Sequence, residues 1–342
     1  MKKRYLIAGA GVGFAGAAIA AKLLSRPREI EWREHAGEIL HAEYSWFMTI
    51  DGARVHYQDA GPEDGPAILL VHGFCSSTLV WSEVFLRLAG AGFRVVAPDL
   101  LGHGFSDKPP DGEYTIESQA RMVLGLMDQL GLKSATLVGS SYGGAISASI
   151  ALDFPERVEK LVLVGAVIND EARNQLLLRV ARSPVVGDIV SPLLLDSRWL
   201  VRRRLGKIYS EGARQLFDDK RLELRHLPLK AASTHMAILR SLRRWRAERI
   251  EQEAHRIRQP TLLIWGEQDT DTPLRLGEHL KRVMPDARLI IFRRCGHLPQ
   301  EEYPEDFTKL VTDFVCGEAG IESVKESARL EREPERERPL SP

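Results

Sequence analysis

The sequence predicts an α/β fold, with a mostly parallel central sheet flanked by helices and a helical cap inserted after the sixth strand. Two observations support this prediction. Short apolar runs typical of buried strands recur along the chain, with helix-like segments between several of them, and strands joined through helices pair in parallel. The alternation is interrupted once, between residues 169 and 257, where no buried strand can be recognised.

The first two expected strands form a hairpin. They span residues 46–50 and 54–58 and flank Asp51-Gly52, a dipeptide typical of a tight turn. Continuous apolar runs, which indicate strands covered on both faces, then follow at 67–71, 94–97, 135–138, 160–164, 261–265 and 288–292. Helices are expected at 80–89, 116–130, 143–154 and 274–283.

The interruption at 169–257 is rich in leucine and arginine and contains Pro184, Pro192 and Pro228. Its amphipathic pattern predicts a helical cap over a core made of residues 45–168 and 258–316. Residues 170–249 hold 18 Lys and Arg against 9 Asp and Glu. The expected cap is therefore strongly basic, although the whole chain is neutral.

Both ends of the chain differ from this core. Residues 1–30 begin with Met1-Lys2-Lys3-Arg4, followed by an uncharged stretch to residue 21, which predicts a signal anchor or a cleaved signal peptide. A soluble N-terminal helix is the third alternative. We therefore expect a membrane-associated or exported protein, with a cytoplasmic location left open. Residues 317–342 are rich in Glu, Arg, Ser and Pro and predict a disordered charged tail.

Composition excludes several classes of function. The 47 basic and 47 acidic residues balance, which argues against a nucleic-acid partner. Cys75, Cys295 and Cys316 are too widely spaced for a disulfide framework or a zinc site. Residues 11–16 match G-x-G-x-x-G, but the next fold begins near residue 45 and leaves no room for a dinucleotide domain. We expect no cofactor and no metal.

Ser141 is the candidate nucleophile. It is the central residue of Gly139-Ser140-Ser141-Tyr142-Gly143, directly after the expected strand 135–138 and just before a helix. A sharp turn from strand to helix strains the central residue and is tolerated only beside small neighbours, here Gly139 and Gly143. Such a turn presents the hydroxyl at the carboxyl edge of the sheet, where open α/β folds bind their ligands.

A serine hydroxyl needs a base to become a nucleophile, and that base needs an orienting carboxylate. His297 follows the last expected strand and is the candidate base. Asp269 follows the preceding strand and is the candidate carboxylate, with Asp271 as its competitor. The order Ser, Asp, His along the chain is the one typical of this strand–turn–helix arrangement.

The backbone amides of Phe74 and Tyr142 are the candidate donors to an oxyanion. Phe74 follows His72-Gly73 at the end of the first parallel strand, and Tyr142 directly follows the nucleophile. His72 could be mistaken for a catalytic base. We expect it instead to support the loop that shapes the oxyanion site.

Taken in order, these motifs resemble those of the α/β-hydrolase family, specifically of serine hydrolases with a helical cap such as esterases and monoacylglycerol lipases. The resemblance spans residues 45–316 and implies an α/β-hydrolase fold and an acyl-enzyme mechanism. Haloalkane dehalogenases and epoxide hydrolases of this fold use an aspartate as nucleophile. The serine at position 141 therefore excludes these two classes of enzyme. The motifs are His72-Gly73-Phe74, the segment 99–109, Gly139-x-Ser141-x-Gly143, Gly266-x-x-Asp269 and Gly296-His297-x-Pro299.

The expected activity is cleavage of a carboxylic ester, in particular a lipid-like or other hydrophobic small-molecule ester. The basic cap beside an apolar N-terminus suggests docking on an anionic membrane surface. A solvated helix face that keeps the cap soluble would show the same charges. Two other functions remain as alternatives: a carbon–carbon bond hydrolase of the same fold that takes vinylogous diketones, and a non-catalytic membrane-associated binding protein.

Overall fold

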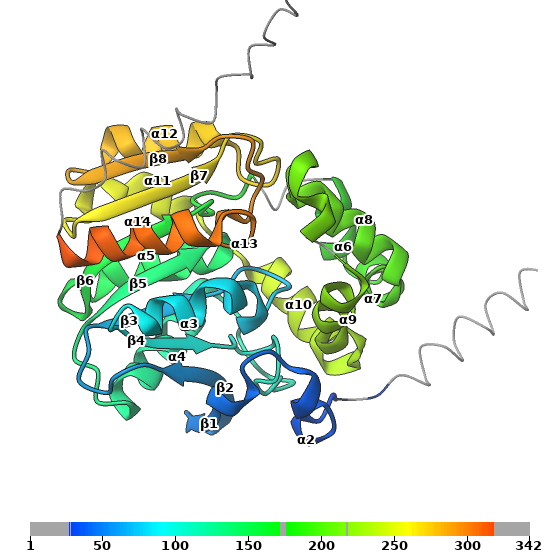
Figure 1. The fold of residues 1–342 in the computed structure, drawn as a ribbon. Coiled ribbons are helices and arrows are strands. Elements are labelled where there is room, and N and C mark those ends of the chain that lie inside the picture. The colour runs from blue at the N-terminus through cyan, green and yellow to red at the C-terminus, as the bar shows by residue number, and fades with distance from the viewer. Residues whose placement is uncertain (1–26, 28, 172–175, 217, 318–342) are drawn as a thin grey trace, which may run out of the picture.

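The computed structural model describes residues 27, 29–171, 176–216 and 218–317. A central sheet of eight strands crosses the molecule, with helices on both of its faces (Figure 1). The eight strands expected from the sequence are present, with bounds that agree to within two residues. They are β1 Ser45–Ile50, β2 Ala53–Ala60, β3 Ala67–Val71, β4 Arg94–Pro98, β5 Ala135–Ser140, β6 Val158–Val164, β7 Thr261–Gly266 and β8 Ala287–Phe292.

The strand order is β1-β2-β4-β3-β5-β6-β7-β8. The hairpin strands β1 and β2 are antiparallel to each other, and β2 is antiparallel to β4. All pairings from β4 through β8 are parallel. The carboxyl ends of β3, β5, β6, β7 and β8 therefore lie along one edge of the sheet, and the loops that follow these strands meet there.

Two layers of helices cover the sheet. Helices α3 (Ser82–Gly90) and α14 (Pro304–Cys316) pack on one face, and α4 (Ile116–Gln129), α5 (Tyr142–Asp153) and α12 (Leu274–Val283) pack on the other. Helix α14 was not among the helices expected from the sequence. The central helix α5 is buried along nearly its whole length, because its small Gly, Ala and Ser side chains let neighbouring elements approach closely.

The stretch between β6 and β7 forms the helical cap (Figure 1). It contains α6 (Leu176–Arg182), α7 (Val186–Asp196), α8 (Arg198–Ile208), α9 (Asp219–His226) and α10 (Ala232–Arg244), followed by α11 (Glu248–Glu253) at the return to the core. The described part of this stretch contains no strand. The cap follows the sixth strand, as the sequence predicts.

The two terminal predictions cannot be compared with the fold. The apolar segment and its G-x-G-x-x-G match lie in residues 1–26, and the charged tail lies in residues 318–342; both are outside the described residues. Within the part of the chain that is described, no helix combines the length and the apolar character needed to cross a membrane.

Candidate active site

Ser141 lies at the turn between β5 and α5. Its backbone has φ 55° and ψ −116°, a combination that residues with a side chain rarely adopt. Four backbone hydrogen bonds hold this conformation. The Ser141 amide donates to the carbonyl of Val164 at 2.9 Å, and the Ser141 carbonyl accepts from the amides of Gly144 and Val167, both at 3.0 Å, and of Ala145 at 3.3 Å. The result is the strained turn that the motif around Ser141 predicts.

The glycines around Ser141 are required by close backbone approaches. A Cβ on Gly139 would lie 2.4 Å from the carbonyl oxygen of Gly143, and a Cβ on Gly143 would lie 2.1 Å from that of Val71. A Cβ on Gly73 would come within 3.1 Å of the Cβ of Ser141. The loop after β3 therefore passes directly against the Ser141 side chain.

His297 and Asp269 meet at the same edge of the sheet. His297 follows β8, and its Nδ1 lies 2.7 Å from Oδ2 of Asp269, which follows β7. Because a carboxylate only accepts, Nδ1 is the protonated nitrogen and Nε2 remains available as a base. The other oxygen of Asp269 accepts from the backbone amides of Asp271, at 2.8 Å, and Thr272, at 3.0 Å. The carboxylate is thus held on both sides.

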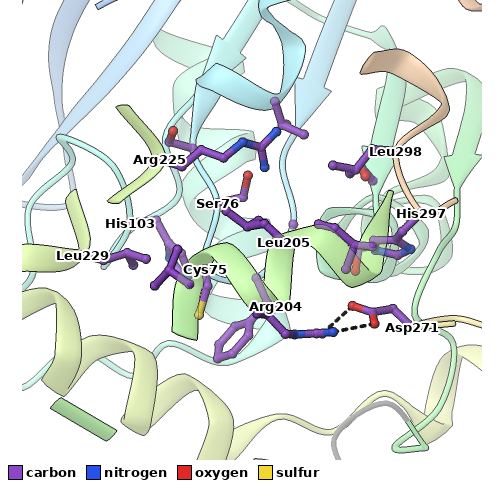
Figure 2. A pocket seen from close by; sticks show the side chains of 18 of the residues that line it. Cys75, Ser76, His103, Arg204, Leu205, Arg225, Leu229, Asp271, His297 and Leu298 are labelled. Atoms are coloured by element: carbon purple, nitrogen blue, oxygen red, sulfur yellow. Dashed lines mark hydrogen bonds and ion pairs between the residues drawn. The ribbon is translucent and has the colours of Figure 1, made fainter. Parts of the chain in front are cut away.

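Asp271 is engaged elsewhere. Its carboxylate pairs with the guanidinium of Arg204 on cap helix α8, with 2.8 Å between Nη1 and Oδ1. Figure 2 shows the two side chains joined near His297. Of the two aspartates between which the sequence left a choice, Asp269 therefore contacts His297, and Asp271 links the core to the cap.

The backbone amides of Phe74 and Tyr142 flank Ser141. Phe74 lies in the loop after β3, next to Gly73, and Tyr142 is the first residue of α5. No described residue accepts a hydrogen bond from either amide, so both remain candidate donors to a substrate oxygen.

His72 supports the Phe74 loop. Its Nδ1 donates to the carbonyl of Gly73 at 2.8 Å, and its Nε2 accepts from the amide of Leu100 at 3.0 Å. Complete burial lowers its pKa, although the nearby Asp99 opposes this shift. Because both ring nitrogens are used within the fold, His72 has no nitrogen left to serve Ser141.

A cavity of about 370 Å³ separates the carboxyl edge of the sheet from the cap. Ser141, Phe74 and His297 lie in its wall. The cap contributes apolar and cationic side chains, several of which are visible in Figure 2. They include Leu178, Leu195, Leu200, Leu205, Leu229, Arg203, Arg204, Lys207 and Arg225. In the described chain, no cluster of His, Cys, Asp or Glu side chains is suited to hold a metal ion.

A sequence profile of the alpha/beta hydrolase fold matches residues 66–189 and 191–304, which include Ser141, Asp269 and His297. The chain belongs to the α/β-hydrolase family. The order of its strands, its strained serine turn and its histidine–carboxylate pair agree with this membership.

Three relatives of this α/β-hydrolase bear on its chemistry. A 2-hydroxy-6-oxo-2,4-heptadienoate hydrolase of Pseudomonas putida is 30% identical over 285 residues, covering 82% of this chain and 99% of that protein. The structure of a mutant of CumD, a meta-cleavage product hydrolase from Pseudomonas fluorescens, has 26% identity and a TM-score of 0.68, covering 80% of this chain and 98% of that one. A membrane phospholipase A has 25% identity and a TM-score of 0.67, covering 93% and 99% respectively.

Two residues beside the histidine–carboxylate pair of this α/β-hydrolase were missed by sequence reasoning. The hydroxyl of Thr272 lies 2.8 Å from both Oδ2 of Asp269 and the carbonyl of Gly165. Gly165 has φ 48°, and a Cβ there would lie 3.0 Å from Oδ2 of Asp269 and 3.2 Å from Nδ1 of His297. The one available indication was the position of Gly165, directly after the sixth strand at the same edge.

The loop that holds His297 is also joined to the cap. The His297 amide donates to the carbonyl of Ile208 at 2.7 Å. Beside this bond, the buried carboxylate of Glu301 accepts from the Tyr209 hydroxyl and from the guanidinium of Arg225. The segment after α8 is therefore fixed to the loop after β8 by backbone and side-chain contacts.

The charges around His297 predict its pH dependence. Burial lowers the pKa of His297, but the charge of Asp269 and the hydrogen bond to it raise it more, and Asp271 adds to the increase, so the net effect is a raised pKa. Since His297 must be neutral to accept a proton, kcat/KM should rise with pH through a pKa above that of an ordinary imidazole. Asp271→Asn removes a negative neighbour, so the acid limb of the profile should move to lower pH.

Arg204→Met provides the matched control for this measurement. Arg204 lowers the pKa of His297, so its removal should move the acid limb to higher pH, opposite to the shift in Asp271→Asn. An acid limb at the same pH in both variants would contradict the electrostatic account.

Proposed function

We propose that this α/β-hydrolase is a serine hydrolase that cleaves a carbon–carbon bond in an anionic vinylogous diketone. The observation that carries the proposal is the cationic wall of the cavity that contains Ser141 and His297. The Pseudomonas putida relative, a 2-hydroxy-6-oxo-2,4-heptadienoate hydrolase, supports it. Such a substrate is a carboxylate with a ketone at a fixed distance from its charge.

The cations of this wall differ in whether a carboxylate of the protein already neutralises them. Arg204 is paired with Asp271, and Arg225 is paired with the buried Glu301. Arg203 and Lys207 have no carboxylate partner among the described residues. They are therefore the two pocket cations available to attract a substrate carboxylate and to stabilise the charge that develops on a dienolate leaving group.

The proposed reaction gives each candidate residue a defined role. Ser141 Oγ adds to the ketone carbon while His297 Nε2 accepts its proton, and the Phe74 and Tyr142 amides donate to the oxyanion. In the keto tautomer of the substrate, which is the vinylogous diketone, the carbon–carbon bond then breaks, its electron pair enters the conjugated system as a dienolate, and His297 returns the proton to the leaving carbon. Water hydrolyses the resulting acyl-enzyme, while Asp269 orients His297 throughout.

Hydrolysis of a hydrophobic ester is the second candidate. The leucines of the cap make much of the cavity apolar, and the membrane phospholipase A matches 93% of this chain. The chemistry at Ser141 would be the same, except that the leaving group is an alkoxide. The carbon–carbon reaction is preferred because an uncharged ester makes no use of the unpaired cations.

The two candidates are separated by assaying one purified protein on both substrate classes. We expect a higher kcat/KM for a 2-hydroxy-6-oxo-dienoate than for p-nitrophenyl esters of any chain length. If a long-chain ester is the better substrate and the dienoate is not turned over, the carbon–carbon assignment is wrong and the ester candidate replaces it.

Lys207→Met tests the role of the cationic wall. It should raise KM for the dienoate about tenfold, since a hydrogen bond to a charged group is lost, and leave KM for p-nitrophenyl acetate unchanged. Lys230→Met is the control, because Lys230 is a cap lysine that pairs with Glu223 and does not line the cavity. Equal increases for the charged and the neutral substrate would contradict this role.

A further inference from the structure

A second hollow lies on the cap, apart from the catalytic cavity. It is lined by Arg179, Arg182, Arg243 and Arg246, together with Ser183 and Pro184. We call these four arginines the arginine site. Helix α6 contributes the first two, and the other two come from the last turn of α10 and the residues just after it.

The charges of the arginine site are mostly unneutralised. Arg243 pairs with Asp188 at 2.8 Å and donates to the carbonyls of Arg182 and Ser183, which fixes its position. Arg179, Arg182 and Arg246 have no carboxylate partner within the described chain. Several like charges around one hollow produce a strong local positive potential, and an anion bound there would relieve their mutual repulsion.

Exposed apolar side chains lie near the arginine site along the chain, on the helices and the turn that contribute to it. Val180 is 38% exposed, Val185 69%, Val186 50% and Ile189 51%. They lie on α6, on α7 and on the turn between these two helices. A free phosphate would use the arginines alone, whereas a bilayer of anionic phospholipid presents phosphates beside an apolar layer and would use both kinds of side chain.

Pro27, the first residue that the structure describes, contacts this same cap. The carbonyl of Pro27 accepts a hydrogen bond from the amide of Ala232, the first residue of α10, at 3.0 Å. A helix of 13 residues spans about 20 Å, and the arginine site lies at the other end of α10. Pro27 therefore lies within about one helix length of the arginine site, and the residues that precede it in sequence, 1–26, are basic and then apolar.

We propose that the arginine site, with Val185, Val186 and Ile189, docks the cap onto an anionic phospholipid bilayer. The guanidinium groups bind lipid phosphates, and the apolar side chains enter the boundary between headgroups and acyl chains. Leu178 and Trp245, which alternate with these arginines in sequence, line the catalytic cavity. Docking therefore holds the cap side of the cavity close to the bilayer, whichever substrate the cavity takes.

The test compares the full chain on vesicles of phosphatidylcholine alone and of phosphatidylcholine mixed with phosphatidylglycerol. The measured quantity is the ratio of the two partition coefficients, because the N-terminal segment contributes to both. Arg179→Gln with Arg182→Gln should lower this ratio about 25-fold, or about fivefold for each arginine. Arg198→Gln with Arg202→Gln removes the same charge from cap arginines that already pair with Asp219, and should change the ratio no more than about twofold.

Three results would overturn the proposal. Equal losses in the two double variants would mean that net charge alone drives binding. Displacement by inorganic phosphate, beyond that caused by chloride at equal ionic strength, would mean that the site binds free phosphate. Unchanged binding of a Val185→Ser, Ile189→Ser variant to both kinds of vesicle would exclude the apolar contact. Equal melting temperatures of all variants exclude unfolding as the cause of a loss.

Discussion

Replacing Ser141 by Ala should lower turnover at least about a thousandfold, because Oγ of Ser141 is the proposed nucleophile of the acyl-enzyme step. It should also abolish covalent labelling by a fluorophosphonate probe. Ser140→Ala is the matched control. Ser140 is the buried neighbour, with its Oγ 3.5 Å from Nε2 of Gln300, and its loss should change turnover less than about tenfold.

This experiment distinguishes a serine hydrolase from a non-catalytic membrane-associated binding protein. Undiminished hydrolysis in Ser141→Ala would refute the nucleophile. If the unmodified chain neither reacts with the probe nor turns over any ester or dienoate, the cavity serves binding alone.

Asp269→Asn should lower kcat about ten-thousandfold. An amide in this place can present its NH₂ group to Nδ1 of His297, which favours the tautomer protonated on Nε2 and removes the base that Ser141 needs. The adjacent amides of Asp271 and Thr272 donate to Asp269, so its replacement also weakens the loop that holds it.

Asp271→Asn is the control for this loss, since it lies two residues away in the same loop. It should retain kcat within about tenfold and differ mainly in its pH profile. Comparable losses in both variants would mean that loop integrity, rather than the carboxylate of Asp269, supports turnover.

Local patterns explain what the sequence could predict. A continuous apolar run identifies a buried strand from its own residues, and the small residues around Ser141 identify a strained turn. The choice between Asp269 and Asp271 is different, because both follow the same strand. It is decided by Arg204, which is 67 residues away from Asp271 along the chain and reaches it only once the cap has folded over the core.

Contacts between distant residues also limit what the sequence can predict about the cap and the substrate. The composition of the cap indicates a basic surface but not which cations are paired, so the sequence alone favoured a lipid-like ester. Arg203 and Lys207 in the cavity wall, which are unpaired among the described residues, together with the Pseudomonas putida relative, support the proposal of an anionic diketone instead. Gly165 and Thr272 were missed because their importance lies in contacts with residues far along the chain.

The bond between the amide of His297 and the carbonyl of Ile208 has a practical consequence for protein engineering. A cap exchanged with a relative could be joined at the ends of the flanking strands, here β6 and β7. A foreign cap joined in this way would replace Ile208 and Tyr209 but keep His297 and Glu301. The contacts of Ile208 with His297 and of Tyr209 with Glu301 would then be lost. A chimera should therefore retain the native segment Ile208 to Ser210, or transplant the loop after β8 together with the cap.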